Sequence, residues 1–281
     1  MLIQTFKKLF FSELKGIYPE TEIQSFFNIL IEFKLNLTRI DLALNTNLEL
    51  NNDDINYFQD ALDKLKNHIP VQHIIGETNF YNSTFKVDEN VLIPRPETEE
   101  LVDWIIKDTS KVKNIKILDI GTGSGCIAIS LAKNIPNAEV FAIDLSPTAL
   151  KIANENALIN KVSVNFIETD ILNLDKLPTE FDIIVSNPPY VRDLEKEMMH
   201  QNVLANEPHL ALFVKNDNPL LFYNKIADLA KHHLNTEGKL YFEINQYLGK
   251  DTKELLRLKG FKNIELKKDI FNVDRMLKSS I

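Results

Sequence analysis

The spacing of hydrophobic residues changes near residue 76. Before that point, apolar side chains recur every three or four positions, which is typical of amphipathic helices. The residues with this spacing are Phe6, Leu9, Phe10, Leu14, then Ile23, Phe26, Phe27, Leu30, Ile31, Leu35, then Ile55, Phe58, Ala61, Leu62 and Leu65. The polar run 51–54 offers an N-cap and an acidic first turn to the third group. The pattern predicts a domain of four or five helices over residues 1–75.

From residue 76 the hydrophobic period becomes two. Thr78 and Phe80, then Phe85 and Val87, alternate with polar residues around a turn at 81–84, which predicts a β-hairpin. We expect this hairpin to form a linker over residues 76–94. The sequence IPRPETEELVDWII follows, and its second proline suits the first turn of a helix with acidic residues behind it.

Beyond residue 114, predicted strands and helices alternate. The strands cover residues 114–120, 138–144, 162–168, 181–187, 239–245, 261–269 and 274–280, with helices at 126–133 and 147–158 among them. Nearly continuous apolar runs such as DIIVS suit parallel strands buried on both faces. We therefore predict an open, mostly parallel α/β sheet over residues 95–281, with helices on both sides and a C-terminal antiparallel hairpin.

Composition narrows the classes of protein. The formal net charge is −8, shared equally between residues 1–80 and 81–281, so neither part has the basic balance typical of nucleic-acid binding. The single cysteine, Cys126, excludes an intrachain disulfide framework, and the six histidines show no metal-ligand spacing with it. No apolar run approaches the length of a membrane helix. We expect a cytoplasmic protein without a metal site or membrane contact.

Glycine is scarce except at one place. The chain holds 8 glycines, and three of them, Gly121, Gly123 and Gly125, fall within five residues directly after a predicted strand. Glycines there let the backbone turn tightly and approach a ligand closely. The next predicted strand ends at Asp144, where a carboxylate can accept both hydroxyls of a ribose. This spacing predicts a cofactor that contains a nucleoside.

The pattern D-x-G-x-G-x-G resembles motif I of class I S-adenosylmethionine-dependent methyltransferases, which have a Rossmann-like fold. A dinucleotide fingerprint would instead require glycine where Cys126 stands. The resemblance implies that Asp119 orients the loop and the methionine moiety, that Asp144 binds the ribose, and that Asp170 lies near the adenine with Ile171 beside it. The cofactor loop would comprise Gly121, Thr122, Gly123, Ser124 and Gly125.

The tetrapeptide Asn187-Pro188-Pro189-Tyr190 follows a predicted strand and must leave the sheet, because proline cannot continue a ladder. The Asn187 side-chain oxygen and the Pro188 carbonyl can each accept one N–H of a planar –NH2 group. The same two dipoles stabilise the positive charge that nitrogen gains on methylation. Tyr190 offers a ring face to the planar group. We predict that Asn187 also contacts the cofactor.

The chain as a whole resembles the release-factor glutamine methyltransferase family. The likeness rests on the IPRPETE segment, SNPPY, Glu207-Pro208 with Ala211-Leu212, and the ending DIFNVDRML. It implies methylation at N5 of the glutamine in the Gly-Gly-Gln motif of peptide chain release factors 1 and 2, with S-adenosylhomocysteine as the second product. The helical domain would help to hold the release factor. Arg95, Thr98 and Glu99 would lie near the cofactor or shape the substrate cleft.

Other functions remain open at this point. The glutamine methyltransferase of ribosomal protein L3 resembles the same family in its catalytic half. Amino-methyltransferases of DNA or RNA bases share the NPPY tetrapeptide but are disfavoured by the acidic charge. A nucleotide-binding module without catalysis, or an NAD-dependent oxidoreductase, is disfavoured by the intact NPPY and by Cys126.

Overall fold

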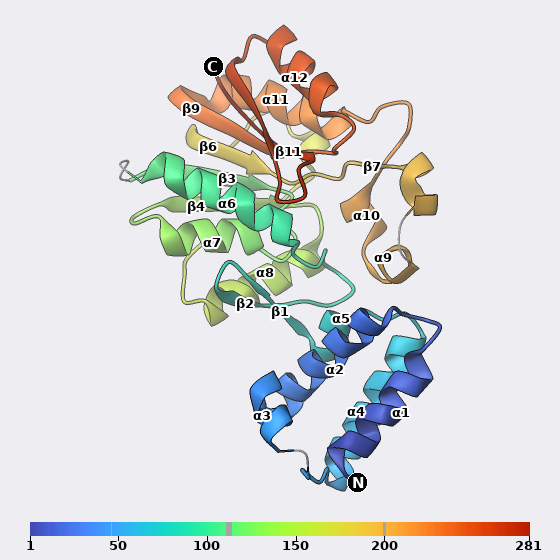
Figure 1. Cartoon of the computed structure of the whole chain (residues 1–281). Coiled ribbons are helices and arrows are strands. Elements are labelled where there is room, and N and C mark those ends of the chain that lie inside the picture. Colours follow the sequence, from blue (N-terminus) through green and yellow to red (C-terminus); the bar gives the residue numbers. More distant parts are fainter. Residues whose placement is uncertain (46, 111–113, 199–200) are drawn as a thin grey trace. The chain divides into compact units, whose positions relative to one another are not determined.

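The computed structural model describes residues 1–45, 47–110, 114–198 and 201–281, which form two compact units (Figure 1). The first unit comprises Met1–Gly76 and the later helix α9 (Gln201–Asn206). The second unit begins at Glu77 and holds the remaining described residues. The expected linker hairpin therefore belongs to the second unit, and the functional boundaries at 75 and 94 stay a prediction.

The first unit is helical, as the hydrophobic period predicts. Its other helices are α1 (Ile3–Leu14), α2 (Glu20–Leu35), α3 (Arg39–Leu44), α4 (Asn52–Lys66) and α5 (Val71–Ile75). Its core combines buried leucines and isoleucines with phenylalanines, and the ring centroids of Phe6 and Phe58 lie 5.4 Å apart. Asn51 caps α4 as predicted, because its side chain accepts from the Asp54 amide. Leu9, which shares the helical spacing of these core residues, is 40% exposed.

The second unit opens with the predicted hairpin, β1 (Glu77–Phe80) and β2 (Ser83–Lys86). Its two turn residues have positive φ angles, as a tight two-residue hairpin turn requires. The buried Asn156 ties this hairpin to the glycine loop. Its side-chain oxygen accepts from the Lys86 amide, and its side-chain nitrogen donates to the Lys86 carbonyl. The same nitrogen also donates to the Ser124 carbonyl at 2.9 Å.

A seven-stranded sheet forms the centre of the second unit, in the order β10-β11-β9-β6-β3-β4-β5. The strands are β3 (Lys116–Ile120), β4 (Glu139–Asp144), β5 (Asn165–Glu168), β6 (Phe181–Ser186), β9 (Leu234–Glu243), β10 (Lys262–Lys268) and β11 (Asp274–Ser280). Pairing is parallel from β5 to β9, and antiparallel between β9, β11 and β10. The predicted fold class, with its C-terminal antiparallel hairpin, is confirmed.

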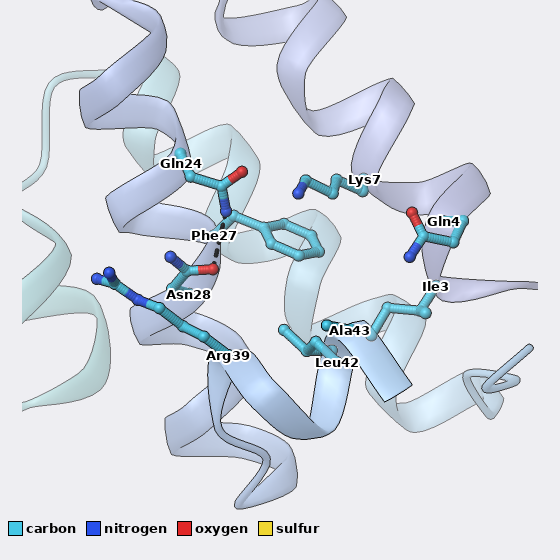
Figure 2. A pocket seen from close by; sticks show the side chains of 9 residues that line it. All are labelled: Ile3, Gln4, Lys7, Gln24, Phe27, Asn28, Arg39, Leu42 and Ala43. Atoms are coloured by element: carbon cyan, nitrogen blue, oxygen red, sulfur yellow. Dashed lines mark hydrogen bonds between the residues drawn. The ribbon is translucent and has the colours of Figure 1, made fainter. Parts of the chain in front are cut away.

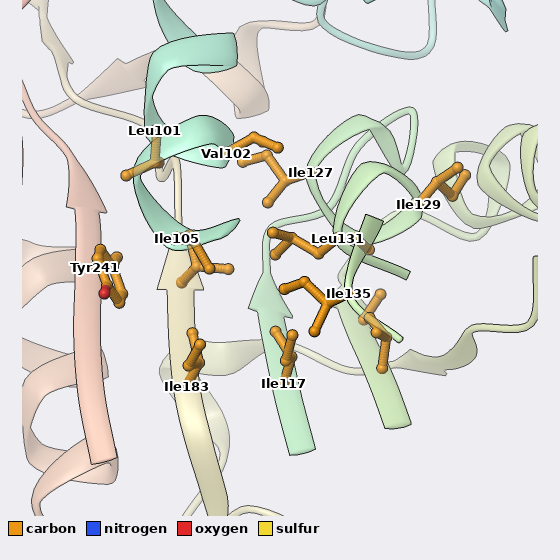
Figure 3. Packing of buried hydrophobic residues seen from close by; sticks show 14 of the residues in the cluster. Leu101, Val102, Ile105, Ile117, Ile127, Ile129, Leu131, Ile135, Ile183 and Tyr241 are labelled. Atoms are coloured by element: carbon orange, nitrogen blue, oxygen red, sulfur yellow. The ribbon is translucent and has the colours of Figure 1, made fainter. Parts of the chain in front are cut away.

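Helices cover both faces of the sheet. The longer ones are α6 (Pro96–Thr109), α7 (Cys126–Asn134), α8 (Pro147–Ile159), α11 (Leu221–His233) and α12 (Gly249–Leu258). Figure 3 shows α6 and α7 directing side chains such as Ile105 and Leu131 toward Ile117 and Ile183 of the strands. On the opposite face, α11 and α12 pack against Leu118 and other apolar strand residues.

Several short elements connect the sheet to its helices, and the hydrophobic pattern did not predict them. They are η1 (Ile171–Asn173), β7 (Val191–Arg192), η2 (Asp193–Met198), α10 (His209–Leu212) and β8 (Phe213–Val214). Such elements are too short to show a hydrophobic period. Across the four described stretches of chain, no helix is long and apolar enough to cross a membrane.

Candidate active site

The two predicted site loops begin at the ends of neighbouring strands. β3 and β6 pair in parallel with Ile120 opposite Ser186, and the Ser186 hydroxyl donates to the Ile120 carbonyl at 2.6 Å. The glycine loop follows β3 and the Asn-Pro-Pro-Tyr tetrapeptide follows β6. Because parallel strands end at the same edge, this register brings both loops to the carboxyl edge of the sheet, where open α/β folds bind ligands.

Both loops line one cavity of about 510 Å³. This volume lies within the range usual for small-molecule sites. The predicted site residues that line it are Gly121, Thr122, Gly123, Ser124, Asp144, Asp170, Ile171, Asn187, Pro188 and Pro189. Arg95 and Thr98 line it as well, whereas Glu99 does not. The sequence analysis therefore selected residues that are distant in the chain and close in space.

Three predicted site residues lie behind the cavity lining. Asp119 is fully buried under the glycine loop and accepts from the Thr122 hydroxyl at 2.6 Å. Burial raises the pKa of Asp119 to about 7. Tyr190 is half-buried and donates to Glu243 at 3.1 Å, which directs its hydroxyl into the protein. Gly125, the third, packs between helices.

The three loop glycines have different reasons to be glycine. All have positive φ angles, 76° at Gly121, 54° at Gly123 and 82° at Gly125, which other residues adopt at a cost. A Cβ on Gly121 or Gly123 would meet no atom within 4 Å, so these two leave open space toward a ligand. A Cβ on Gly125 would lie 2.8 Å from Ile129 Cδ1 and 3.2 Å from Ala153 Cβ. Gly125 therefore permits close packing of α7 on α8.

Asp144 holds the loop that it faces. One carboxylate oxygen accepts from the Gly123 amide at 2.8 Å, and the other accepts from the Ser146 amide at 2.9 Å. Each oxygen keeps a further lone pair for a ligand hydroxyl. Asp170 similarly accepts from the Leu172 amide at 2.9 Å and so fixes the start of η1 beside the cavity.

Cys126 lines the cavity at the start of α7, where the dinucleotide fingerprint has glycine. Burial raises the pKa of its thiol to about 12. Cys126 therefore stays protonated and acts as a small apolar wall.

An ion pair holds Arg95, which lines the cavity. Arg95 donates to Glu207 Oε1 at 2.6 Å, and the Glu207 side chain is only 1% exposed. Burial raises the pKa of Glu207, and the adjacent guanidinium opposes that rise. The pair joins residues 112 positions apart in the sequence.

Replacing Arg95 with alanine should lower the free energy of unfolding by about 2 kcal/mol, because Glu207 would remain buried without its cation. Urea unfolding would measure the change. Arg257→Ala is the matched control, since Arg257 and Glu254 form an exposed pair, and its expected cost is below about 0.5 kcal/mol. Equal costs for the two variants would contradict a stabilising role for the Arg95–Glu207 pair.

A second cavity, of about 290 Å³, lies in the first unit between α1, α2 and α3. Figure 2 shows its polar side, where Gln24 donates to Asn28 at 2.8 Å near Lys7 of α1. The residues predicted for catalysis and cofactor binding all belong to the other unit. Among the described residues, no cluster of histidine, cysteine, aspartate or glutamate could hold a metal ion.

The sequence analysis missed several residues of the site. Leu145, Thr169, Leu210, Ala211 and Phe222 add mainly apolar lining, and Glu243 lies behind it. Leu145 directly follows Asp144, so its place could have been inferred. Glu243 could also have been noticed in the sequence, because burying a carboxylate in the apolar run KLYFEIN costs free energy unless a hydrogen-bond or charged partner compensates it.

Comparison of the sequence with known proteins finds methyltransferase relatives. Residues 98–213 match the methyltransferase small domain, and residues 9–76 match the PrmC N-terminal domain. The release factor glutamine methyltransferase of Flavobacterium psychrophilum is 57% identical over 99% of both chains. The protein of the same name from Bacteroides thetaiotaomicron is 42% identical over 94% of this chain and 95% of its own.

A solved structure supports the fold alone. The hMettl16 catalytic domain, in complex with a MAT2A 3′UTR hairpin, is 15% identical and covers 84% of this chain and 85% of its own, with a TM-score of 0.58. The Flavobacterium and Bacteroides proteins show the family as well as the fold, because their sequence identity to this chain extends through both the helical unit and the sheet. The chain therefore belongs to the release factor glutamine methyltransferase family.

Proposed function

We propose that this chain transfers the methyl group of S-adenosylmethionine to the side-chain amide nitrogen of a glutamine in a peptide chain release factor. The finer assignment is N5 of the glutamine in the Gly-Gly-Gln motif of release factors 1 and 2. The observation that carries the proposal is the shared cavity, in which the glycine loop and Asp144 face the same space as Asn187 and Pro188. One side of that space suits a nucleoside and the other suits a primary amide.

The residues present fit S-adenosylmethionine. Gly121 and Gly123 leave open space where any side chain would intrude. The Ser124 hydroxyl is buried at the cavity without a hydrogen-bond partner in the described structure, so it is available to a ligand. Asp144 would hold the ribose hydroxyls, while Asp170 and Ile171 would border the adenine. When bound, S-adenosylmethionine supplies a methyl group activated by a sulfonium and leaves as S-adenosylhomocysteine.

Asn187 and Pro188 would orient the glutamine amide. An amide nitrogen is a poor nucleophile because its lone pair is delocalised into the carbonyl group. The Asn187 side-chain oxygen and the Pro188 carbonyl would each accept one N–H and fix the plane of the amide. These two acceptors also stabilise the positive charge that develops on nitrogen. The N-methylated cation is acidic and loses its extra proton to water, so the site needs no strong general base.

The helical unit would hold the release factor. Its match to the PrmC N-terminal domain supports this role, and the acidic net charge favours a protein substrate over a nucleic acid. We propose that the protein acts in the cytoplasm, binds no nucleic acid directly, and has release factors 1 and 2 as its partners.

The test is methyl transfer from labelled S-adenosylmethionine to purified substrates. Separate reactions would contain release factor 1, release factor 2, ribosomal protein L3 and nucleic acid. We expect label on the two release factors, and mass spectrometry should place a single added methyl group on the glutamine of Gly-Gly-Gln. Label on ribosomal protein L3 or on nucleic acid alone would overturn the assigned substrate.

A further inference from the structure

A buried carboxylate lies behind the Asn-Pro-Pro-Tyr tetrapeptide. Glu243 is the last residue of β9 and is 1% exposed. Two hydroxyls donate to it: Thr98 Oγ1 reaches Oε2 at 2.6 Å, and the Tyr190 hydroxyl reaches Oε1 at 3.1 Å. Glu243 therefore links the start of α6 to the last residue of the tetrapeptide.

The single hydroxyl proton of Thr98 determines how the Asn187 amide is oriented. A threonine hydroxyl has one proton, and here that proton is donated to the carboxylate. The hydroxyl oxygen can then only accept. It faces Asn187 Nδ2 at 3.5 Å, so the nitrogen of the Asn187 amide points to Thr98 and the oxygen points elsewhere. A reversed amide would set two oxygen lone pairs against each other.

We propose that Glu243 is a positioning residue, which acts through the Thr98 hydroxyl to present the oxygen of Asn187 to the substrate amide. This inference rests on the proposed function, because it assigns that oxygen to the glutamine N–H. With the nitrogen of Asn187 presented instead, two donors would face each other and the glutamine would lose one of its two acceptors.

The second oxygen of Glu243 fixes the other end of the tetrapeptide. It accepts from the Tyr190 hydroxyl, while Asn245 Nδ2 donates to the Tyr190 carbonyl at 2.9 Å. One carboxylate thus restrains both the first and the fourth residue, Asn187 through Thr98 and Tyr190 directly. The Pro188 carbonyl, the other proposed acceptor, lies between these two restrained ends.

An ionised carboxylate can accept a hydrogen bond from Thr98 and another from Tyr190 at the same time. It accepts on each oxygen, whereas a glutamine side chain has one acceptor and one donor. In a Glu243→Gln variant, the new amide nitrogen could face Thr98. The Thr98 hydroxyl would then accept from that nitrogen and could donate its own proton toward Asn187. That exchange would favour the reversed amide. Burial raises the pKa of Glu243, and the hydrogen bond from Thr98 and the charge of Arg275 on β11 oppose that rise and favour the ionised form.

The test uses Glu243→Gln and Thr98→Val in the full-length protein, with release factor as substrate. Each variant should lower kcat by up to about 100-fold through misplacement of the acceptor, and should leave the Kd for S-adenosylmethionine nearly unchanged. Thr98→Ser restores the hydroxyl and should retain most of kcat. The double variant should be little worse than either single one, because both interrupt the same chain of hydrogen bonds.

Tyr241→Phe is the matched structural control. Tyr241 lies two residues before Glu243 on the same strand and donates to Asp108 at 2.6 Å, outside the cavity lining. Its loss should change the free energy of unfolding without changing kcat. This control separates an effect on the site from a general loss of stability.

The outcomes separate this inference from the proposed function. If the wild-type chain methylates release factor and both variants keep the wild-type kcat, the positioning role is wrong and the function stands. A kcat for Thr98→Ser as low as that for Thr98→Val would also overturn it, because the hydroxyl would then not be the group that matters. If the wild-type chain fails to methylate release factor, the proposed function itself fails.

Discussion

Asn187→Ala should lower the rate of methyl transfer to release factor by about 100- to 1000-fold, the range seen when one preorganised group that stabilises transition-state charge is removed. The side-chain oxygen would no longer accept a glutamine N–H or stabilise positive charge on nitrogen. The Pro188 carbonyl would remain, so a low residual rate is expected. Single-turnover reactions with saturating S-adenosylmethionine would measure the methylation step directly.

The affinity for S-adenosylmethionine should fall only slightly, because Asn187 would make one cofactor contact among several, while the glycine loop after β3 and Asp144 at the end of β4 would hold most of the cofactor. Asn134→Ala is a suitable control, since Asn134 donates to the Ser130 carbonyl within its own helix and does not line the cavity. A variant at Asn187 that methylates at the wild-type rate would remove this residue from the proposed mechanism. Loss of cofactor binding alone would reassign it to the cofactor side of the cavity.

Asp144→Ala should raise the Kd for S-adenosylmethionine by about 100-fold. The carboxylate would offer two charge-assisted hydrogen bonds to the ribose, worth about 1.5 kcal/mol each, and about 3 kcal/mol corresponds to this factor. The variant also loses the bonds from the Gly123 and Ser146 amides that order the loop. Isothermal titration calorimetry would measure the affinity.

Glu168→Ala provides the comparison for Asp144→Ala. Glu168 is the register partner of Asp144 on β5, is exposed, and does not line the cavity. Its replacement should leave the Kd unchanged. The shift in Tm that the cofactor produces should likewise be lost in Asp144→Ala and kept in Glu168→Ala. Equal affinities for the two variants would contradict the assignment of Asp144 to the ribose.

Local sequence signals were sufficient for much of the fold. The change of hydrophobic period near residue 76 separates a helical unit from an α/β unit, and each predicted strand of the sheet is present. The glycine loop and Asp144 could be selected from short spacing along the chain, and both line the cavity. The structure explains their convergence with Asn187, because β3 and β6 pair in parallel and end at the same edge of the sheet.

Long-range pairs could not be predicted from the sequence. Thr98 and Glu243 are 145 positions apart, and Arg95 and Glu207 are 112 positions apart. Such contacts depend on how α6 and the segment around α10 pack beside the sheet, which no local period encodes. Tyr190 shows the same limit, because nothing in the tetrapeptide indicates that its hydroxyl donates to Glu243, which lies 53 positions later.

The central position of β3 and β6 in the sheet has a consequence for hydrogen exchange. Both proposed site loops begin on β3 and β6, each of which is paired on both of its sides within the sheet. Amide protons of such central strands usually exchange with solvent only when the whole domain unfolds. The amides at the ends of β3 and β6, where both site loops begin, should therefore be among the slowest-exchanging amides of the protein.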